Sequence, residues 1–254
     1  MKRLAVVILM LLLAGCAAPA GNSFEQQARA RSSAGARVHT ELAAQYYDRT
    51  QYGVALEEVA RALAIEPNYA PAYNVRGLVH MALREDEQAE ADFLHGLDLD
   101  ARDSEGANNY GWFLCQRGRE RESVKWFLTA LKNPLYTTPA KAYLNAGVCS
   151  RKAGDMRQAE GFLRQALTLQ PEMPEALLNL ADFSYASGDL PGAKSYFLRY
   201  VQSLDNAPLS AENLWLGVRI ERKLGDAVAE EKYAAQLRKR YPDARETQLM
   251  LYQK

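Results

Sequence analysis

Residues 179–194, NLADFSYASGDLPGAK, hold two small residues, Ala181 and Ala193, on either side of the turn signal Gly188-Asp189. A small residue recurs at the place of Ala181 along the chain, with separations of 34, 34, 36, 34 and 36 residues. This first row consists of Ala43, Gly77, Gly111, Gly147, Ala181 and Gly217. Self-similarity at a fixed period indicates stacked copies of one supersecondary unit, so we expect six such units.

Two further rows keep the same spacing. The second row is Ala55, Ala89, Ser123, Ala159, Ala193 and Ala229. The third row has larger side chains four residues later, namely Val59, Phe93, Phe127, Leu163, Phe197 and Tyr233. Small residues allow two helices to pack at the short end of the usual axial distance of about 8–10 Å. We therefore predict a pair of helices per unit, with the third row filling the space beside the contact.

Glycine and proline mark the expected ends of these helices. Gly118, Gly154 and Gly188 lie between the first and second rows, where a left-handed residue ends a helix. Pro67, Pro134, Pro171 and Pro242 lie where second helices should stop, because proline cannot continue a helix. No segment shows sustained strand alternation, so the pattern predicts an all-α protein.

This combination resembles the tetratricopeptide repeat, a 34-residue helix-turn-helix unit. The resemblance covers about residues 36–242 and implies an all-α, right-handed superhelical solenoid of six repeats with a C-terminal capping helix at 243–254. The expected repeats are residues 36–69, 70–103, 104–137, 140–173, 174–207 and 210–243. Tyr200 and Gln236 stand where earlier repeats have alanine or glycine, so we expect the last repeats to pack less regularly.

The N-terminus reads as an export signal. Lys2 and Arg3 precede an apolar run at residues 4–13, which is too short to cross a bilayer that needs about twenty apolar residues. The following Leu-Ala-Gly-Cys resembles the bacterial lipobox, which implies removal of residues 1–15 and a covalent lipid on Cys16. By the rule of that family, Ala17 after the cysteine implies the periplasmic face of the outer membrane. The alternative is an ordinary signal peptide in which Cys16 stands at the junction by chance.

Residues 16–35 are rich in alanine, glycine, serine, glutamine and arginine, and we interpret them as a lipid-anchored tether. The repeat domain would then be residues 36–254. The other two cysteines are Cys115 and Cys149. They could pair in an oxidising compartment, but spacing alone does not place them within bridging distance, so we favour small packed residues.

The composition excludes several classes of function. The chain has 31 basic and 31 acidic residues and no basic block, which argues against nucleic acid as a partner. It lacks the sequence motifs of zinc proteases, redox dithiols, serine hydrolases and phosphate loops. His39 and His80 fit packed positions, and the carboxylates are assigned to turns and solvated helix faces. We therefore expect a monomer that is not an enzyme, without metal, cofactor or small-molecule substrate.

After these exclusions, the class of function that we expect is protein binding. In stacked helical repeats the first helices line the concave side, which makes a groove for a partner chain. Groove positions taken from the repeat family are Tyr47, Asn74, Leu78, Met81, Asn108, Trp112, Leu144, Val148, Leu178 and Tyr185, and the alternative for each is packing between helices. A second candidate surface lies at the first repeat, where nothing in the sequence covers Val38, Leu42, Tyr46, Tyr47 and Tyr52.

A lipobox, a short tether and six repeats filling the mature chain resemble the pilotin family of type IV pilus biogenesis lipoproteins, PilF and PilW. Residues 108–119, NNYGWFLCQRGR, and 179–194 carry part of this resemblance. It implies a non-catalytic protein that binds the pilus secretin and promotes its outer-membrane localisation and multimerisation. The alternative is a repeat lipoprotein that acts as an adaptor for cell-wall hydrolases or for outer-membrane barrel assembly.

Overall fold

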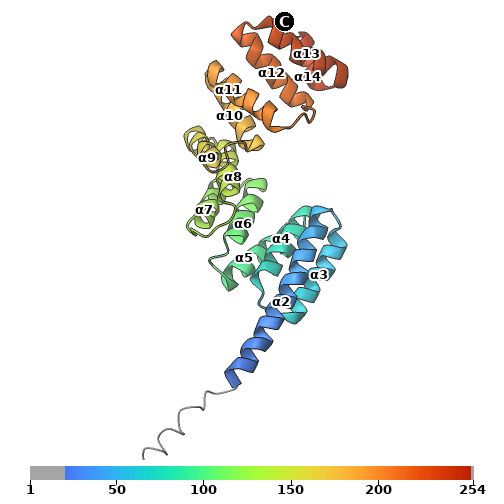
Figure 1. The fold of residues 1–254 in the computed structure, drawn as a ribbon, viewed down its shortest axis with the longest axis vertical. Helices are drawn as coiled ribbons and strands as arrows, with labels where there is room; N and C mark the ends of the chain where they lie inside the picture. The colour runs from blue at the N-terminus through green and yellow to red at the C-terminus, as the bar shows by residue number, and fades with distance from the viewer. Residues whose placement is uncertain (1–20, 253–254) are drawn as a thin grey trace, which may run out of the picture. The chain divides into compact units, whose positions relative to one another are not determined.

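The computed structural model describes residues 21–252, which form thirteen α-helices and no strand (Figure 1). The predicted signal peptide and Cys16 lie outside the described residues. The helices are α2 (Gly21–Asp48), α3 (Tyr52–Ile65), α4 (Ala70–Leu83), α5 (Asp86–Leu99), α6 (Ser104–Gln116), α7 (Glu120–Ala130), α8 (Pro139–Lys152), α9 (Met156–Leu169), α10 (Pro174–Ser187), α11 (Leu190–Ser203), α12 (Ala211–Leu224), α13 (Ala227–Arg240) and α14 (Arg245–Tyr252). The predicted all-α class is confirmed, and none of these helices is both long and apolar enough to cross a membrane.

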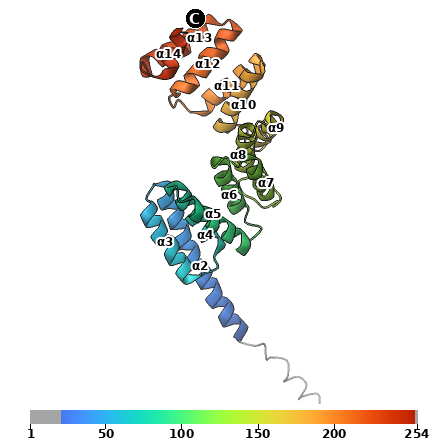
Figure 2. The same ribbon diagram turned by 180° about the vertical axis from the view of Figure 1, so that it is seen from behind.

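The chain divides into two compact units, residues 1–103 and 104–254. In the first unit α2 packs against α3 and α4 against α5, and the second hairpin rests on the first through α2 and α3. Figure 2 shows the same two hairpins from behind. One core cluster of this unit consists of the small and medium apolar side chains Ala36, Ala43, Val59, Ala62, Ala72 and Val75. Such short side chains permit the close helix approach that the row pattern predicts.

The second unit contains four helical hairpins followed by α14. The hairpins are α6 with α7, α8 with α9, α10 with α11 and α12 with α13. Helix α14 packs against α12 and α13 and buries Thr247 and Met250, whereas Leu251 and Tyr252 are exposed. It thereby covers the open end of the last hairpin. This confirms the predicted capping helix, which a stacked array needs because its last apolar face would otherwise meet water.

The three residue rows form one packing motif inside the hairpins whose first-row residue is Gly77, Gly111 or Gly147. A Cβ atom added to Gly77 would lie 2.9 Å from the ring of Phe93, and one added to Gly111 would lie 2.8 Å from the ring of Phe127. Ser123 of the second row brings its backbone carbonyl to 3.1 Å from that same Gly111 position. The first row is therefore small because the third-row side chain rests directly on it. The predicted packing is confirmed.

Left-handed residues close the first helices, as the glycine positions predict. Gly118 has φ +78° and Gly188 has φ +87°. After Gly118 the chain turns back, and the Arg119 amide donates to the Leu114 carbonyl at 2.9 Å, which satisfies a free acceptor at the end of α6. Arg84, with φ +66°, adopts this conformation at the equivalent turn without being glycine.

The structure differs from the tether interpretation over residues 21–35, because α2 already begins at Gly21 and extends past α3 (Figure 1). The packed part starts where Ser32 Oγ donates to the Ile65 carbonyl at 3.0 Å, and Ala36 is fully buried. Alanine, glutamine and arginine are strong helix formers, so this composition extends the first helix of the first repeat. The anchoring role of residues 16–20 stays a prediction.

Candidate protein-interaction site

An apolar stripe runs along one side of α2 in the first repeat. Val38, Leu42 and Tyr46 follow one another at intervals of four residues, which places them on one face of the helix. Val38 is 50% exposed, and Leu42 and Tyr46 are half-buried. Ala36 and Ala43 are fully buried in the core of this unit. We call Val38, Leu42 and Tyr46 the α2 stripe.

Tyr47 and Tyr52 form a separate pair. Their ring centroids lie 5.9 Å apart across the turn from α2 to α3. Since each helical residue turns by about 100°, Tyr47 lies on a different side of α2 from the stripe. Burial raises the pKa of the Tyr47 hydroxyl above its usual value, and charge on Tyr52 and Asp48 acts in the same direction. The five residues predicted as one patch are thus a stripe and a tyrosine pair.

The other predicted groove residues divide by burial. In the first unit Leu78 and Met81 are half-buried on α4, whereas Asn74 is 8% exposed. In the second unit the half-buried residues are Trp112, Leu144, Val148, Leu178 and Tyr185. Trp112 packs beside the two cysteines, and Leu144, Leu178 and Tyr185 pack against the core of the last repeats. In each half-buried residue, part of the side chain packs within the fold and part remains accessible to a partner.

Asn108 is a packing residue and requires a correction. Its side chain is fully buried, and its Oδ1 accepts a hydrogen bond at 3.0 Å from Nδ2 of Asn145 on the next repeat. The Asn108 Nδ2 donates to Asn109 Oδ1 at 3.4 Å. A buried amide must find such partners because an unpaired one is costly. Asn108 therefore links neighbouring first helices and does not face a partner.

The two cysteines are also not as predicted. Cys115 on α6 and Cys149 on α8 form a disulfide, with their Cα atoms 5.9 Å apart. Both are buried, in a cluster with Phe127 and Ala146. The interpretation as unpaired packing residues was therefore wrong. The bridge joins the first helices of the third and fourth repeats.

Buried carboxylates inside the first unit were missed by sequence reasoning. Glu58 and Asp92 are each only 6% exposed, so the assignment of carboxylates to solvated surfaces was wrong for them. His39 Nδ1 lies 2.6 Å from Glu58 Oε2, and Arg76 donates to Asp92 through Nε at 2.9 Å and Nη2 at 2.6 Å. The available signal was positional, because the equivalent residues of the next three repeats are the aromatic Trp126, Phe162 and Tyr196. In the first two repeats a buried carboxylate with a polar partner therefore takes the place of an aromatic side chain.

The pair between Arg76 and Asp92 gives a testable prediction. Its hydrogen bonds raise the Arg76 pKa above the usual value, although burial acts against this. Arg76→Met leaves the Asp92 carboxylate buried without its main donor, and we expect it to lower the free energy of unfolding by about 2–3 kcal/mol. The double variant with Asp92→Leu should regain most of that loss. Urea denaturation of both single variants and the double variant measures the coupling, and simple additivity would contradict it.

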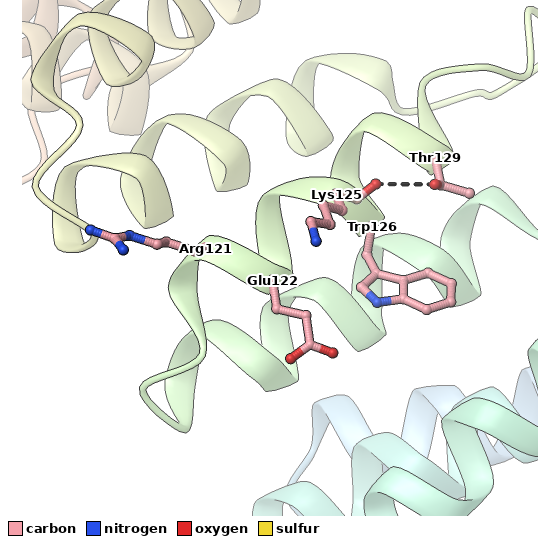
Figure 3. A pocket seen from close by; sticks show the side chains of 5 residues that line it. All are labelled: Arg121, Glu122, Lys125, Trp126 and Thr129. Carbon is pink, nitrogen blue, oxygen red and sulfur yellow. Dashed lines mark hydrogen bonds between the residues drawn. The ribbon is translucent and has the colours of Figure 1, made fainter.

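A surface hollow lies along α7 in the second unit. Its volume is about 530 Å³. Figure 3 shows the side chains that line it, Arg121, Glu122, Lys125, Trp126 and Thr129, all on α7. Thr129 Oγ1 donates to the Lys125 carbonyl at 3.0 Å, so that hydroxyl is used within the helix. Binding pockets usually gather polar groups from several elements, whereas this hollow is one side of a single helix. Within residues 21–252 no group of three or more histidine, cysteine or acidic residues could hold a metal ion.

Repeated helical hairpins, in which a small residue of the first helix packs against a larger side chain of the second, define a tetratricopeptide-repeat protein. Models of the tetratricopeptide repeat match residues 70–103 and 150–211. Proteins of this class are typically non-catalytic mediators of protein contacts.

Known proteins that match this chain over nearly its full length identify the family within this class. The crystal structure of the type IV pilus biogenesis factor PilW is 36% identical, with a TM-score of 0.76 over 85% of this chain and 98% of PilW. The structure of Pseudomonas aeruginosa PilF has a TM-score of 0.81 and 26% identity over 88% of this chain and 99% of that one. The sequence of the Pseudomonas aeruginosa type IV pilus assembly protein PilF is 26% identical over 97% of this chain and 96% of its own length. The chain belongs to the family of type IV pilus biogenesis proteins that includes PilF and PilW.

Proposed function

We propose that this protein is a pilotin. In this role it binds the secretin subunit of the type IV pilus, is held at the periplasmic face of the outer membrane by lipid on Cys16, and promotes secretin multimerisation there. Family membership supports a role in pilus biogenesis, and the α2 stripe supports a grip on a partner chain.

The α2 stripe is the observation that carries the proposal. Val38 is half exposed at the leading edge of the first repeat, with Leu42 and Tyr46 beside it. An apolar row at intervals of four residues suits an apolar helix or strand of a partner, which would bury it. Aromatic residues often contribute most of the binding energy in such contacts, so Tyr46 is the expected anchor.

In this proposal the lipid on Cys16 determines the membrane at which the protein is held. A single acyl chain binds membranes only marginally at about 0.8 kcal/mol per methylene, whereas several chains on one cysteine would hold the protein almost irreversibly. A partner held by an anchored carrier has a raised effective concentration at that membrane. No chemical step is needed for this function.

The binding experiment uses purified protein and secretin. We expect Leu42→Asp to weaken binding at least about 100-fold, because a buried charge replaces an apolar contact at the centre of the stripe. Val38→Asp should act in the same direction. Val228→Asp is the matched control, since Val228 is 85% exposed on α13 in the other unit. Helical circular dichroism should persist in all three variants. Unchanged secretin binding by both stripe variants would remove the stripe from the proposal.

The anchor is tested in cells with Cys16→Ser. We expect secretin multimers to be lost or to remain in the inner membrane, while the protein itself accumulates in soluble form. Membrane fractionation followed by detection of heat-resistant multimers gives the readout. Normal outer-membrane multimers in this variant would refute the role of the lipid, whatever the result for the stripe.

A further inference from the structure

A cluster of cations and aromatic rings lies on the first helices of the last three repeats. Helices α8, α10 and α12 contribute to it, and all three belong to the second unit. We call it the cation–aromatic patch, and it consists of Arg151, Asp182, Tyr185, Trp215, Arg219 and Lys223. Only Tyr185 was a predicted groove residue.

The rings hold the cations in place. The Arg219 guanidinium lies 4.8 Å from the ring centroid of Tyr185 and 5.9 Å from that of Trp215. The Lys223 ammonium lies 5.0 Å from the Tyr185 centroid. Contacts of this kind are attractive and restrict where a long side chain points. Two positive groups are therefore positioned together, with the Tyr185 ring between α10 and α12.

The patch contains one carboxylate, Asp182, and three cations, two of which lie close to it. Asp182 accepts a hydrogen bond at 2.8 Å from Arg151 Nη1. Its contact with Arg219 Nη2 is 3.9 Å, which is beyond hydrogen-bond distance. The Nε atom of Arg219 is buried and has no acceptor in the structure. An unsatisfied buried donor is costly, so the hydrogen bonding of Arg219 within the fold is incomplete.

Nearby acids do not cancel this excess charge. Glu230 accepts from Arg222 Nε at 2.8 Å, and Glu221 accepts from Lys194 Nζ at 2.7 Å. The patch also remains reachable, because the side chains of Arg151 and Arg219 are 36% and 32% exposed.

We propose that the cation–aromatic patch docks an acidic segment of a protein partner through its side-chain carboxylates. A guanidinium presents paired donors that match a carboxylate, and Lys223 adds a second positive charge beside it. This contact is separate from the α2 stripe and does not depend on the identity of the secretin. The protein would then have a second binding surface in its last repeats, and added salt would weaken binding there.

The experiment titrates the purified protein with a fluorescent decaglutamate peptide that is capped at both ends, at about 20 mM salt to limit screening. Binding is followed by fluorescence anisotropy, with decaglutamine as the neutral peptide. We expect the double variant Arg219→Gln and Lys223→Gln to weaken decaglutamate binding at least about tenfold. The matched control, Arg238→Gln with Lys239→Gln, removes the same charge from α13 and should stay within about threefold of the unmodified protein.

Three outcomes of the binding experiments would overturn the inference, and a fourth would come from self-association. The three binding outcomes are no decaglutamate binding, equal weakening in both double variants, or a preference for anionic phosphatidylglycerol vesicles over the peptide. Concentration-dependent dimers that the patch variant abolishes would instead assign the surface to a second copy of the chain. Arg219→Lys provides a check on folding and geometry, because it keeps the charge but loses the paired donors, and we expect intermediate affinity. Secretin binding by the patch variant reports on the proposed function separately.

Discussion

Gly147→Ala is expected to lower the free energy of unfolding by about 2–3 kcal/mol, although alanine is the better helix former. A Cβ atom at this position would lie 2.7 Å from Cγ and 2.9 Å from Cδ2 of Leu163, and 3.2 Å from the Ala159 carbonyl oxygen. Leu163 is fully buried, and its Cγ is not a free end that can swing away. The hairpin must therefore open or Leu163 must leave its rotamer. Thermal and urea unfolding measure the loss.

Gly161 provides the matched control within the same hairpin. It lies inside α9, with nothing within 4 Å of an added Cβ atom. Gly161→Ala should therefore stabilise the protein by about 0.5–1 kcal/mol through helix propensity alone. Adding Leu163→Ala to Gly147→Ala should be less damaging than the sum of the two single changes, because the smaller side chain makes room. A neutral Gly147→Ala would show that the first row does not set the helix approach.

Repetition explains why so much of the fold is predictable. Each row is sampled six times, so a small residue such as Gly147 opposite Leu163 is recognised by its period rather than by its own propensity. The turn at Gly118 and the capping helix α14 follow from equally local rules. Where the first repeat departs from the pattern, local composition decides, and α2 extends into residues predicted as a tether.

Contacts between repeats are harder to predict because they depend on which sides of neighbouring helices meet. Asn108 reads as a groove residue from its row position, but it is buried by Asn145 of the next repeat. The cation–aromatic patch gathers side chains from three helices, and each of them alone resembles an ordinary surface residue. Buried Asp92 is identified only when its place is compared with the aromatic residues of later repeats.

Reduction of the disulfide between Cys115 and Cys149 is expected to lower the free energy of unfolding by about 4 kcal/mol. The bridge closes a loop with a sequence separation of 34 residues, and the chain-entropy model gives this magnitude for such a loop. The loop contains α7 and the two turns that flank it, so loss of the bridge should loosen α6, α7 and α8 first. Hydrogen exchange should show reduced protection in these helices before the last repeats respond.

The sequence already contained a signal for this bridge. Cys115 follows Gly111 by four residues and Cys149 follows Gly147 by two, so both stand on first helices of adjacent repeats. Urea unfolding with and without dithiothreitol measures the effect without removing any side-chain atoms. Cys115→Ala with Cys149→Ala should unfold at the lower urea concentration of the reduced protein and should be insensitive to dithiothreitol. If reduction leaves the unfolding midpoint unchanged, the bridge does not stabilise the junction of the third and fourth repeats, and the buried contacts of Phe127 with its neighbours hold it alone.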